Sequence, residues 1–482
     1  MRFNNQRLIA RHIRHTVFRD RAVWGLWLLM ALGAGYAATV GWVAFQQQRT
    51  TQVHYQQEAR RDWLGNPDKH PHRMAHYGHF AFRSRSPLSL FDGGMDRFLG
   101  NALYLEAHKQ NTVNFSEAGF STGLLRFGDL SLAMLLQVLL PLLIFFLGAG
   151  SVATDRENGT LKLLLSQGVS WSEVLVGKST GLFAVGLTLY GPLLALAGGL
   201  WLAALGGAPT ADETLRFVLL ALFYGLYLGL CCVVAVLVSA VSRTTKTALV
   251  ALIGWWLMLT MVLPRASQAL GTYVYALPSK TAFQSAVQAD ISREGNSHNP
   301  DDPHYAALKD SLLRAYHVAS TEQLPFNYGG YVMAEGEKIS AAVYNKHYHL
   351  LLARFGQQNQ FARTMAFLNP YLALKNLSMA LAGTDFLAYS RFQQQAETYR
   401  YALAQQMNAL QIQYIPNQKR GPTEKDHAID RKYWQDVPDF QYRAPSVAEV
   451  FRAEWVSVAA FGFWLLLLFF LVRGAAHRLS VL

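Results

Sequence analysis

The chain has 482 residues, of which 51% are hydrophobic and 15% are charged, and its net charge is +12. A positive balance of this size can indicate a nucleic-acid partner, so the position of the charge decides its meaning. The two long polar segments, 46–129 and 264–454, hold 29 basic against 25 acidic residues and contribute only +4. The remaining excess lies in short stretches beside apolar runs. We therefore expect no nucleic-acid partner and attribute the charge to membrane topology.

Six apolar runs are each long enough to cross a bilayer, for which about 20 residues are needed. None carries a string of acidic or basic residues, which disfavours a proton- or ion-coupled transporter. The first run is longer than the apolar part of a usual signal peptide and is expected to stay as a membrane helix. The pattern predicts an all-α polytopic membrane protein with six transmembrane helices. The runs lie near Trp24–Phe45, Leu130–Ala153, Val174–Leu205, Phe217–Val241, Thr247–Leu263 and Trp455–Val472.

Short loops rich in Lys and Arg stay in the cytoplasm, and this rule orients the chain. Both termini are expected in the cytoplasm and both long polar segments outside it. The predicted order is a cytoplasmic amphipathic interfacial helix at 1–21, the first span at 22–45, the first extracytoplasmic segment at 46–129, the second span at 130–153, a cytoplasmic loop at 154–175, the third to fifth spans at 176–263, the second extracytoplasmic segment at 264–454, the sixth span at 455–472 and a cytoplasmic tail at 473–482.

The first 21 residues are basic but periodic. Apolar side chains recur every three or four residues and approximate one helical face, while Arg7, Arg11 and Arg14 lie mostly elsewhere. Such a helix suits an anionic inner leaflet, with membrane lipid as its partner. Lys178, where the third span begins, is expected to act as a further interfacial anchor. A basic tail that only obeys the topology rule is the alternative, and both interpretations can hold together.

The outer segments contain no cysteine, because Cys231 and Cys232 both lie within one apolar run. The outer segments must therefore fold by burying a core rather than through disulfides. Two stretches, Lys338–Met365 and Tyr389–Ile415, show apolar residues at helical spacing. Each segment returns to the membrane at both ends. We therefore expect one mainly helical extracytoplasmic domain built from the two insertions.

A short polar segment separates the second and third apolar runs and is the most informative part of the chain. Glu157 and Asn158 favour a helix start, and Gly159-Thr160 a sharp turn. Leu161–Leu165 forms an apolar strip that can bind in the groove of a partner. An ordinary cytoplasmic loop is the alternative interpretation.

Nucleotide binding by this chain is not expected. The stretch Gly177-Lys178-Ser179-Thr180 is like the end of a phosphate-binding loop, which needs a glycine where this chain has Ser172. The stretch also leads directly into an apolar run without a preceding strand. No metalloprotease or serine-hydrolase motif is present either. We therefore predict no catalytic residue.

The polar loop resembles the corresponding loop of ABC-type-2 exporter permeases. In that family a Glu-x-Gly-Thr-Leu segment, a Leu-rich stretch and a Gly-Lys before the next span follow in this order. The resemblance implies a coupling helix that docks on a cytosolic ABC ATPase. It implies two ATPase subunits that hold ATP and Mg²⁺, a second permease chain that is identical or paralogous, and no cofactor on this chain. The implied ATPase-coupling residues are Glu157, Asn158, Gly159, Thr160, Leu161 and Leu164.

A second resemblance covers the first outer segment. Three stretches, 76–82, 86–94 and 105–111, are similar to a bacterial subfamily of these permeases that carries a large extracytoplasmic domain of uncharacterised role. This implies a multi-pass protein of the bacterial inner (plasma) membrane. The possible family-motif residues in the outer segment are His76, Gly78, Asp92, Gly93, Glu106 and His108.

Four histidines, His70, His72, His76 and His79, lie within ten residues, and His108 follows. Imidazoles at this spacing can bind Zn²⁺ or Cu²⁺. Pro71 and Gly78 make one regular face unfavourable, and no cysteine is nearby. Hydrogen-bonded structural histidines are therefore the preferred interpretation, and no metal is expected.

Three functions remain open. An apolar path without charged residues suits export of a lipophilic or amphipathic substrate from the cytoplasm or inner membrane. The first alternative is a mechanotransmitter, whose outer domain acts on an envelope partner without transport. The second alternative is a membrane-anchored metal-dependent enzyme that uses the histidines.

Overall fold

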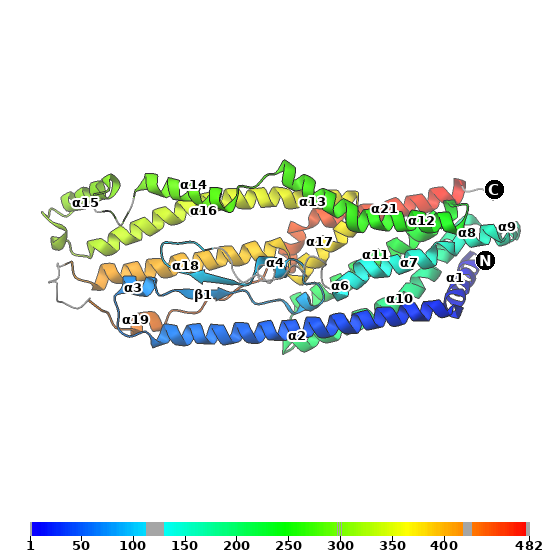
Figure 1. Ribbon diagram of the computed structural model, residues 1–482, viewed down its shortest axis with the longest axis horizontal. Helices are drawn as coiled ribbons and strands as arrows, with labels where there is room; N and C mark the ends of the chain where they lie inside the picture. Colours follow the sequence, from blue (N-terminus) through cyan, green and yellow to red (C-terminus); the bar gives the residue numbers. More distant parts are fainter. Residues whose placement is uncertain are drawn as a thin grey trace.

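The computed structural model describes residues 2–111, 130–295, 297, 299, 301–417 and 427–478. The molecule is elongated, with both termini and the short helix α9 (Thr160–Ser166) at one end and α15 (Pro303–Ala315) at the other (Figure 1). Within these described residues, six helical stretches are long and apolar enough to cross a membrane. The predicted all-α polytopic fold and its six spans are confirmed.

The half of the molecule near the termini contains the six spans and a helix that precedes them. Local signals start these helices. At α10 the Ser170 hydroxyl accepts from the Glu173 amide while the Glu173 carboxylate accepts from the Ser170 amide, and Thr210 and Glu213 repeat this arrangement at α11. The elements are α1 (Arg2–Arg19), α2 (Arg21–Gly65), α6 (Leu132–Met134), η3 (Leu135–Leu139), α7 (Leu140–Gly148), α8 (Gly150–Glu157), α9, α10 (Trp171–Leu205), α11 (Ala211–Val241), α12 (Thr245–Leu257), η4 (Met258–Val262), α13 (Leu263–Val274) and α21 (Trp455–Arg478).

Two spans widen into a single π-helical turn, at η3 and at η4. Pro141 and Pro264 follow these turns directly. A proline has no amide hydrogen and clashes with the carbonyl four residues earlier, so the helix widens just before it. The proline positions therefore explain where both spans are distorted.

Helix α2 runs far beyond the predicted first span. Its 45 residues give a length of about 68 Å, roughly twice the hydrocarbon thickness of a bilayer. Its far end is anchored by Trp63, which is buried and donates its indole N–H to the Trp434 carbonyl at 2.8 Å. One unbroken helix thus connects the membrane half with the outer half.

The outer half joins the two predicted segments, and both predicted long helices are confirmed. The first of these, α16, begins at Tyr328 rather than at Lys338. A small antiparallel pair of strands, which the sequence pattern did not reveal, pairs His79 with Leu105 and Phe82 with Ala102. The elements are α3 (Pro71–Ala75), β1 (His79–Phe82), η1 (Pro87–Leu90), α4 (Asp96–Leu99), β2 (Ala102–Leu105), α14 (Lys280–Glu294), α15, η5 (Thr321–Gln323), α16 (Tyr328–Thr364), η6 (Met365–Phe367), α17 (Pro370–Ala382), α18 (Phe386–Tyr414), α19 (Lys432–Gln435) and α20 (Val447–Ala453).

Helix α17 belongs to the second outer segment but packs into the core of the membrane half. Its side chains at Leu374, Leu377 and Leu381 are buried in the same cluster as those of α7, α10 and α11. Separate, smaller clusters hold the outer half together, one around Trp63, Met407 and Trp434 and one around Phe392. The second segment therefore contacts the spans directly.

Phe392 should be essential for the stability of the outer half. Its ring is fully buried, so Phe392→Ala should lower the free energy of unfolding by about 3–5 kcal/mol. Phe98→Ala is the matched control, because that ring is 58% exposed. The measurement is thermal unfolding of the purified protein in detergent. Equal unfolding temperatures for the two variants would contradict the assigned core.

Candidate functional site

The loop between the second and third spans forms a helix, a turn and a short second helix. Helix α8 ends at Glu157, and Asn158 caps it. Gly159 adopts a left-handed conformation, with φ 75° and ψ −4°, and α9 starts at Thr160. The predicted sharp turn is confirmed. The predicted helix start at Glu157 and Asn158 is wrong, because these residues close the preceding helix.

The apolar strip of α9 is divided between the inside and the outside of the protein. Leu161 is buried in the core of the membrane half, and Leu164 is half-buried. Leu163 is 63% exposed. Leu161 therefore anchors α9 to its own chain rather than facing a partner. Leu163, which the sequence reasoning did not single out, is the leucine that a partner can reach.

Polar contacts hold the end of α8 against α11 and α12. The Arg156 guanidinium donates to the carbonyls of Ala240 and Ser242, at 2.7 and 2.5 Å. The Thr245 hydroxyl donates to the Glu157 carboxylate at 2.7 Å. Because Ala240 and Ser242 lie at the end of α11 and Thr245 at the start of α12, these contacts tie the end of α8 to both helices.

Ser239 adds a buried connection between the same two helices. Its hydroxyl donates to the Ala149 carbonyl at 2.7 Å and accepts from the amides of Val152 and Ala153. The side chain of Ser239 is fully buried. The Ser239 side chain of α11 therefore bonds to backbone atoms of α8 and of Ala149 just before it.

The structure places Lys178 and helix α1, the two predicted contacts with the membrane surface, differently from each other. Lys178 is buried and pairs with Asp155, so its ammonium is not presented at the surface as an anchor would be.

Helix α1 packs closely on α10, where added side-chain atoms at Gly177 and Gly181 would lie about 2.9 Å from Ile9 and Ala10. Arg7, Arg11 and Arg14 remain exposed, as an interfacial helix requires.

A buried polar cluster lies between the outer segments and the spans. The Asp92 carboxylate accepts from Ser378 and from Gln137, whose amide also contacts the Tyr224 hydroxyl. Burial raises the pKa of the Asp92 carboxyl. The backbone at Gly94 has φ 45°, and a side chain there would collide with Thr384. The motif around Asp92 and Gly93 therefore joins the first outer segment to η3, α11 and α17.

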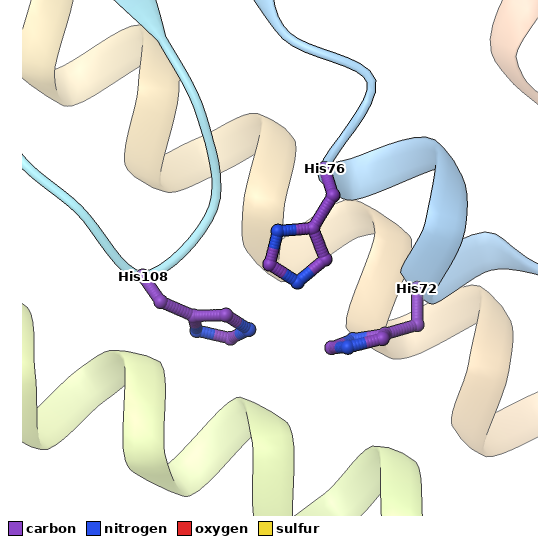
Figure 2. Close-up of side chains that lie close together, drawn as sticks. All are labelled: His72, His76 and His108. Atoms are coloured by element: carbon purple, nitrogen blue, oxygen red, sulfur yellow. The ribbon is translucent and has the colours of Figure 1, made fainter.

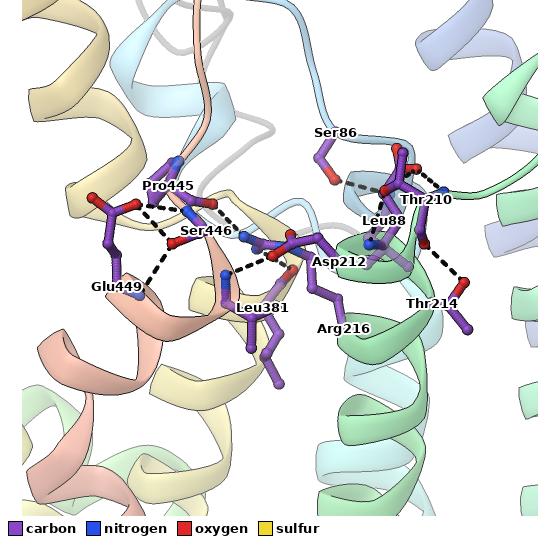
Figure 3. A network of polar contacts seen from close by, with 12 residues as sticks. Ser86, Leu88, Thr210, Asp212, Thr214, Arg216, Leu381, Pro445, Ser446 and Glu449 are labelled. Atoms are coloured by element: carbon purple, nitrogen blue, oxygen red, sulfur yellow. Dashed lines mark hydrogen bonds and ion pairs between the residues drawn. The ribbon is translucent and has the colours of Figure 1, made fainter.

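Arg216 forms the second joint between the halves, at the outer end of α11 (Figure 3). Its side chain is buried, pairs with Asp212 at 2.7 Å, and donates to the carbonyls of Leu381 and Pro445. Asp212 in turn accepts from the Val447 amide at 2.8 Å. One guanidinium therefore holds together α11, the end of α17 and the segment that leads into α20.

The remaining predicted motif residues support the strands of the outer half. Gly78 has φ 78°, and any side chain there would overlap the Tyr104 ring. Glu106 accepts from Asn111 at 2.9 Å and pairs with Lys109. These contacts are structural.

The predicted histidines separate into two groups. His70 caps α3, and His79 is buried beside Trp63. His72 and His76 instead meet His108, which lies about 30 residues further along the chain.

Two family models match adjoining parts of the chain. Residues 101–282 match the model described as ABC-2 family transporter protein, and residues 280–443 match a domain of unknown function (DUF3526). No curated protein and no solved structure matches the chain. The first range contains the complete α8–α9 loop.

Together the two matches are consistent with an ABC-2 permease that carries an additional domain. In this permease the additional domain begins at α14 and extends past α19. His76, Gly78, Asp92 and Gly93 precede both matched ranges, so their assignment to a subfamily stays a prediction.

The left-handed turn at Gly159 can be tested directly. A β-branched side chain is strained at positive φ, so Gly159→Val should destabilise the turn by about 1–2 kcal/mol. Gly159→Asn is the matched control, because Asn adopts this conformation more readily and nothing lies within 4 Å to obstruct it. Limited proteolysis in detergent should cut residues 154–170 faster in the Val variant only. Equal rates of cutting would contradict the turn.

Proposed function

We propose that this permease is the membrane subunit of an ATP-driven exporter that moves a lipophilic or amphipathic substrate out of the cytoplasm or inner membrane. The α8–Gly159–α9 unit carries the proposal, because it presents an exposed apolar side chain on a short helix that is firmly held by three spans. ABC-2 membership supports a permease role in an ABC system.

The proposed assembly contains two cytosolic ATPase subunits, which hold ATP and Mg²⁺, and a second permease chain, identical or paralogous. Leu163 of α9 would dock in a groove of the ATPase. Because α9 lies at the same end as both termini, we place that end in the cytoplasm of a bacterial cell (Figure 1). The exposed arginines of α1 would then face anionic lipid headgroups.

Force on α9 would pass to α11 and α12 through Arg156 and Glu157, and to α10 through the Lys178–Asp155 pair. The Arg156 contact and the Lys178–Asp155 pair are partly buried, so they are screened less than surface pairs, whereas the Thr245–Glu157 contact is exposed. The closing movement of the ATPases would tilt three spans together and open an apolar path between two permeases.

A pocket at the outer end of α10 supports the amphipathic substrate class. The pocket has a volume of about 240 Å³ and lies between α2, α10 and the segment that precedes η1. Phe45, Val53 and Leu205 supply apolar surface, and Arg49 and Arg85 supply positive charge. A molecule with an apolar tail and an acidic head suits this combination.

Mechanotransmission is the second candidate, and the long helix α2 favours it. This helix is continuous from the membrane half to the core around Trp63. Movement of the spans would therefore reach the outer half even if nothing crossed the membrane. In that case an envelope partner, rather than a substrate, would alter ATP turnover.

Leu163→Asp tests the docking helix. Loss of a buried Leu contact costs roughly 1.5–3 kcal/mol, so ATPase binding should weaken at least about tenfold. Leu350→Asp is the matched control, because that side chain is 61% exposed on α16 in the outer half. The measurement is co-purification with the partner ATPase and ATP turnover in reconstituted vesicles.

Unchanged ATPase binding by Leu163→Asp, or equal loss in both variants, would contradict the role of α9. The same vesicles separate the two candidate functions. Accumulation of a lipophilic dye or anionic amphiphile against its gradient supports export. ATP turnover without such transport supports mechanotransmission.

A further inference from the structure

Three histidines from two parts of the first outer segment converge at one point (Figure 2). His72 lies in α3, His76 ends it, and His108 lies in the turn after β2. One ring nitrogen of each lies within 4.8 Å of those of the other two. The ring centroids are 4.7 Å apart for His72 and His76, 5.1 Å for His76 and His108, and 5.6 Å for His72 and His108.

The local structure places the first two rings on one side of a helix. Residues four apart project from the same helical face, so His72 and His76 are neighbours. Met74, between them, is fully buried and anchors α3 in the cluster around Trp434. The strands β1 and β2 then bring His108 back beside the end of α3.

His108 has an unusual backbone conformation, with φ 61° for a residue other than glycine. Such conformations persist only where the surrounding structure enforces them, and they concentrate at functional sites. Here Glu337 of α16 enforces it, because one carboxylate oxygen lies 2.9 Å from both the His108 amide nitrogen and its Nδ1.

The Glu337 carboxylate is fully buried and contacts Arg400 of α18 at 2.7 Å. A carboxylate at Nδ1 holds the proton on that nitrogen, so Nε2 carries the lone pair with which an imidazole coordinates a metal ion. A histidine oriented by a carboxylate in this way is typical of metal ligands.

We propose that His72, His76 and His108 form a binding site for a borderline divalent transition metal, for which Zn²⁺ is the probe, with Glu337 as the residue that positions His108. Three imidazoles without a thiolate suit Zn²⁺ and leave a fourth coordination position for water. His76 is exposed and the other two rings are half-buried, so an ion can enter from solvent. A bound ion would tie α3 to the turn after β2 and, through Glu337, to α16.

The test uses the full-length protein, purified in detergent without a polyhistidine tag and stripped with a chelator. Zn²⁺ is titrated in competition with a chromogenic chelator. One equivalent per chain should bind, and Co²⁺ in place of Zn²⁺ should give the visible absorption of a four-coordinate site. Zinc should also raise the unfolding temperature.

His76→Ala is the first variant, because that side chain is exposed and its loss leaves the core intact. Glu337→Gln is the second and should weaken zinc binding about 10- to 100-fold, since it removes the positioning anion. It also breaks the buried pair with Arg400, so its unfolding temperature without zinc is measured alongside. His76→Ala should weaken binding at least as much and abolish the Co²⁺ spectrum. His317→Ala is the matched control, because His317 also has positive φ but belongs to no histidine cluster in the described residues.

Zinc affinity that is unchanged in His76→Ala, or lowered equally by His317→Ala, would overturn the proposal. So would a wild-type chain that binds no zinc. The readouts are independent of ATP turnover and transport, so failure here leaves the exporter proposal untouched.

Discussion

The buried guanidinium of Arg216 connects the membrane half of this permease to its outer half. Burying a charge is costly unless it is paired and hydrogen-bonded, and Asp212 together with the carbonyls of Leu381 and Pro445 meets that requirement. Arg216 lies near the start of α11. Near the other end of α11, the Ala240 carbonyl accepts a hydrogen bond from Arg156 and the Ser239 hydroxyl donates to Ala149, and these contacts hold α8 in place. Helix α11 is therefore fixed to the α8–α9 loop at one end and to the outer domain at the other. The proposed mechanism depends on this double attachment.

Two other features reinforce the connection. The unbroken α2 reaches from the membrane half to the core around Trp63, and α17 packs among the spans although it follows α16 of the additional domain in sequence. The proposed metal site lies within this outer half, where it would join segments that come from both insertions. Movement at α9 would therefore reach the outer domain through several helices, α2, α11 and α17. Both proposed functions, export and mechanotransmission, would use these helices.

Sequence alone predicted what depends on local pattern. The six spans follow from hydropathy, the long helices α16 and α18 from periodicity, and the turn at Gly159 from residue type. It failed where tertiary contacts decide: α8 continues to Glu157 because Arg156 and Thr245 hold it, and Leu161 turns inward. The histidine grouping was also missed, since only the β1–β2 pairing brings His108 to His72. The joint at Arg216 and Asp212 was missed as well, because its partners at Leu381, Pro445 and Val447 are distant in the sequence.

Hydrogen exchange of the complex with its ATPase tests the central claim, which is that α11 transmits movement from α9 to the outer domain. Peptides covering 150–166, 379–385 and 443–450 are compared with and without vanadate-trapped nucleotide. The account predicts altered protection in all three for the native chain. In Arg216→Met it predicts a smaller change at 379–385 and 443–450, while the change at 150–166 is retained. A change in protection confined to 150–166 in the native chain would contradict the account. So would a change at 379–385 and 443–450 in Arg216→Met that is as large as in the native chain.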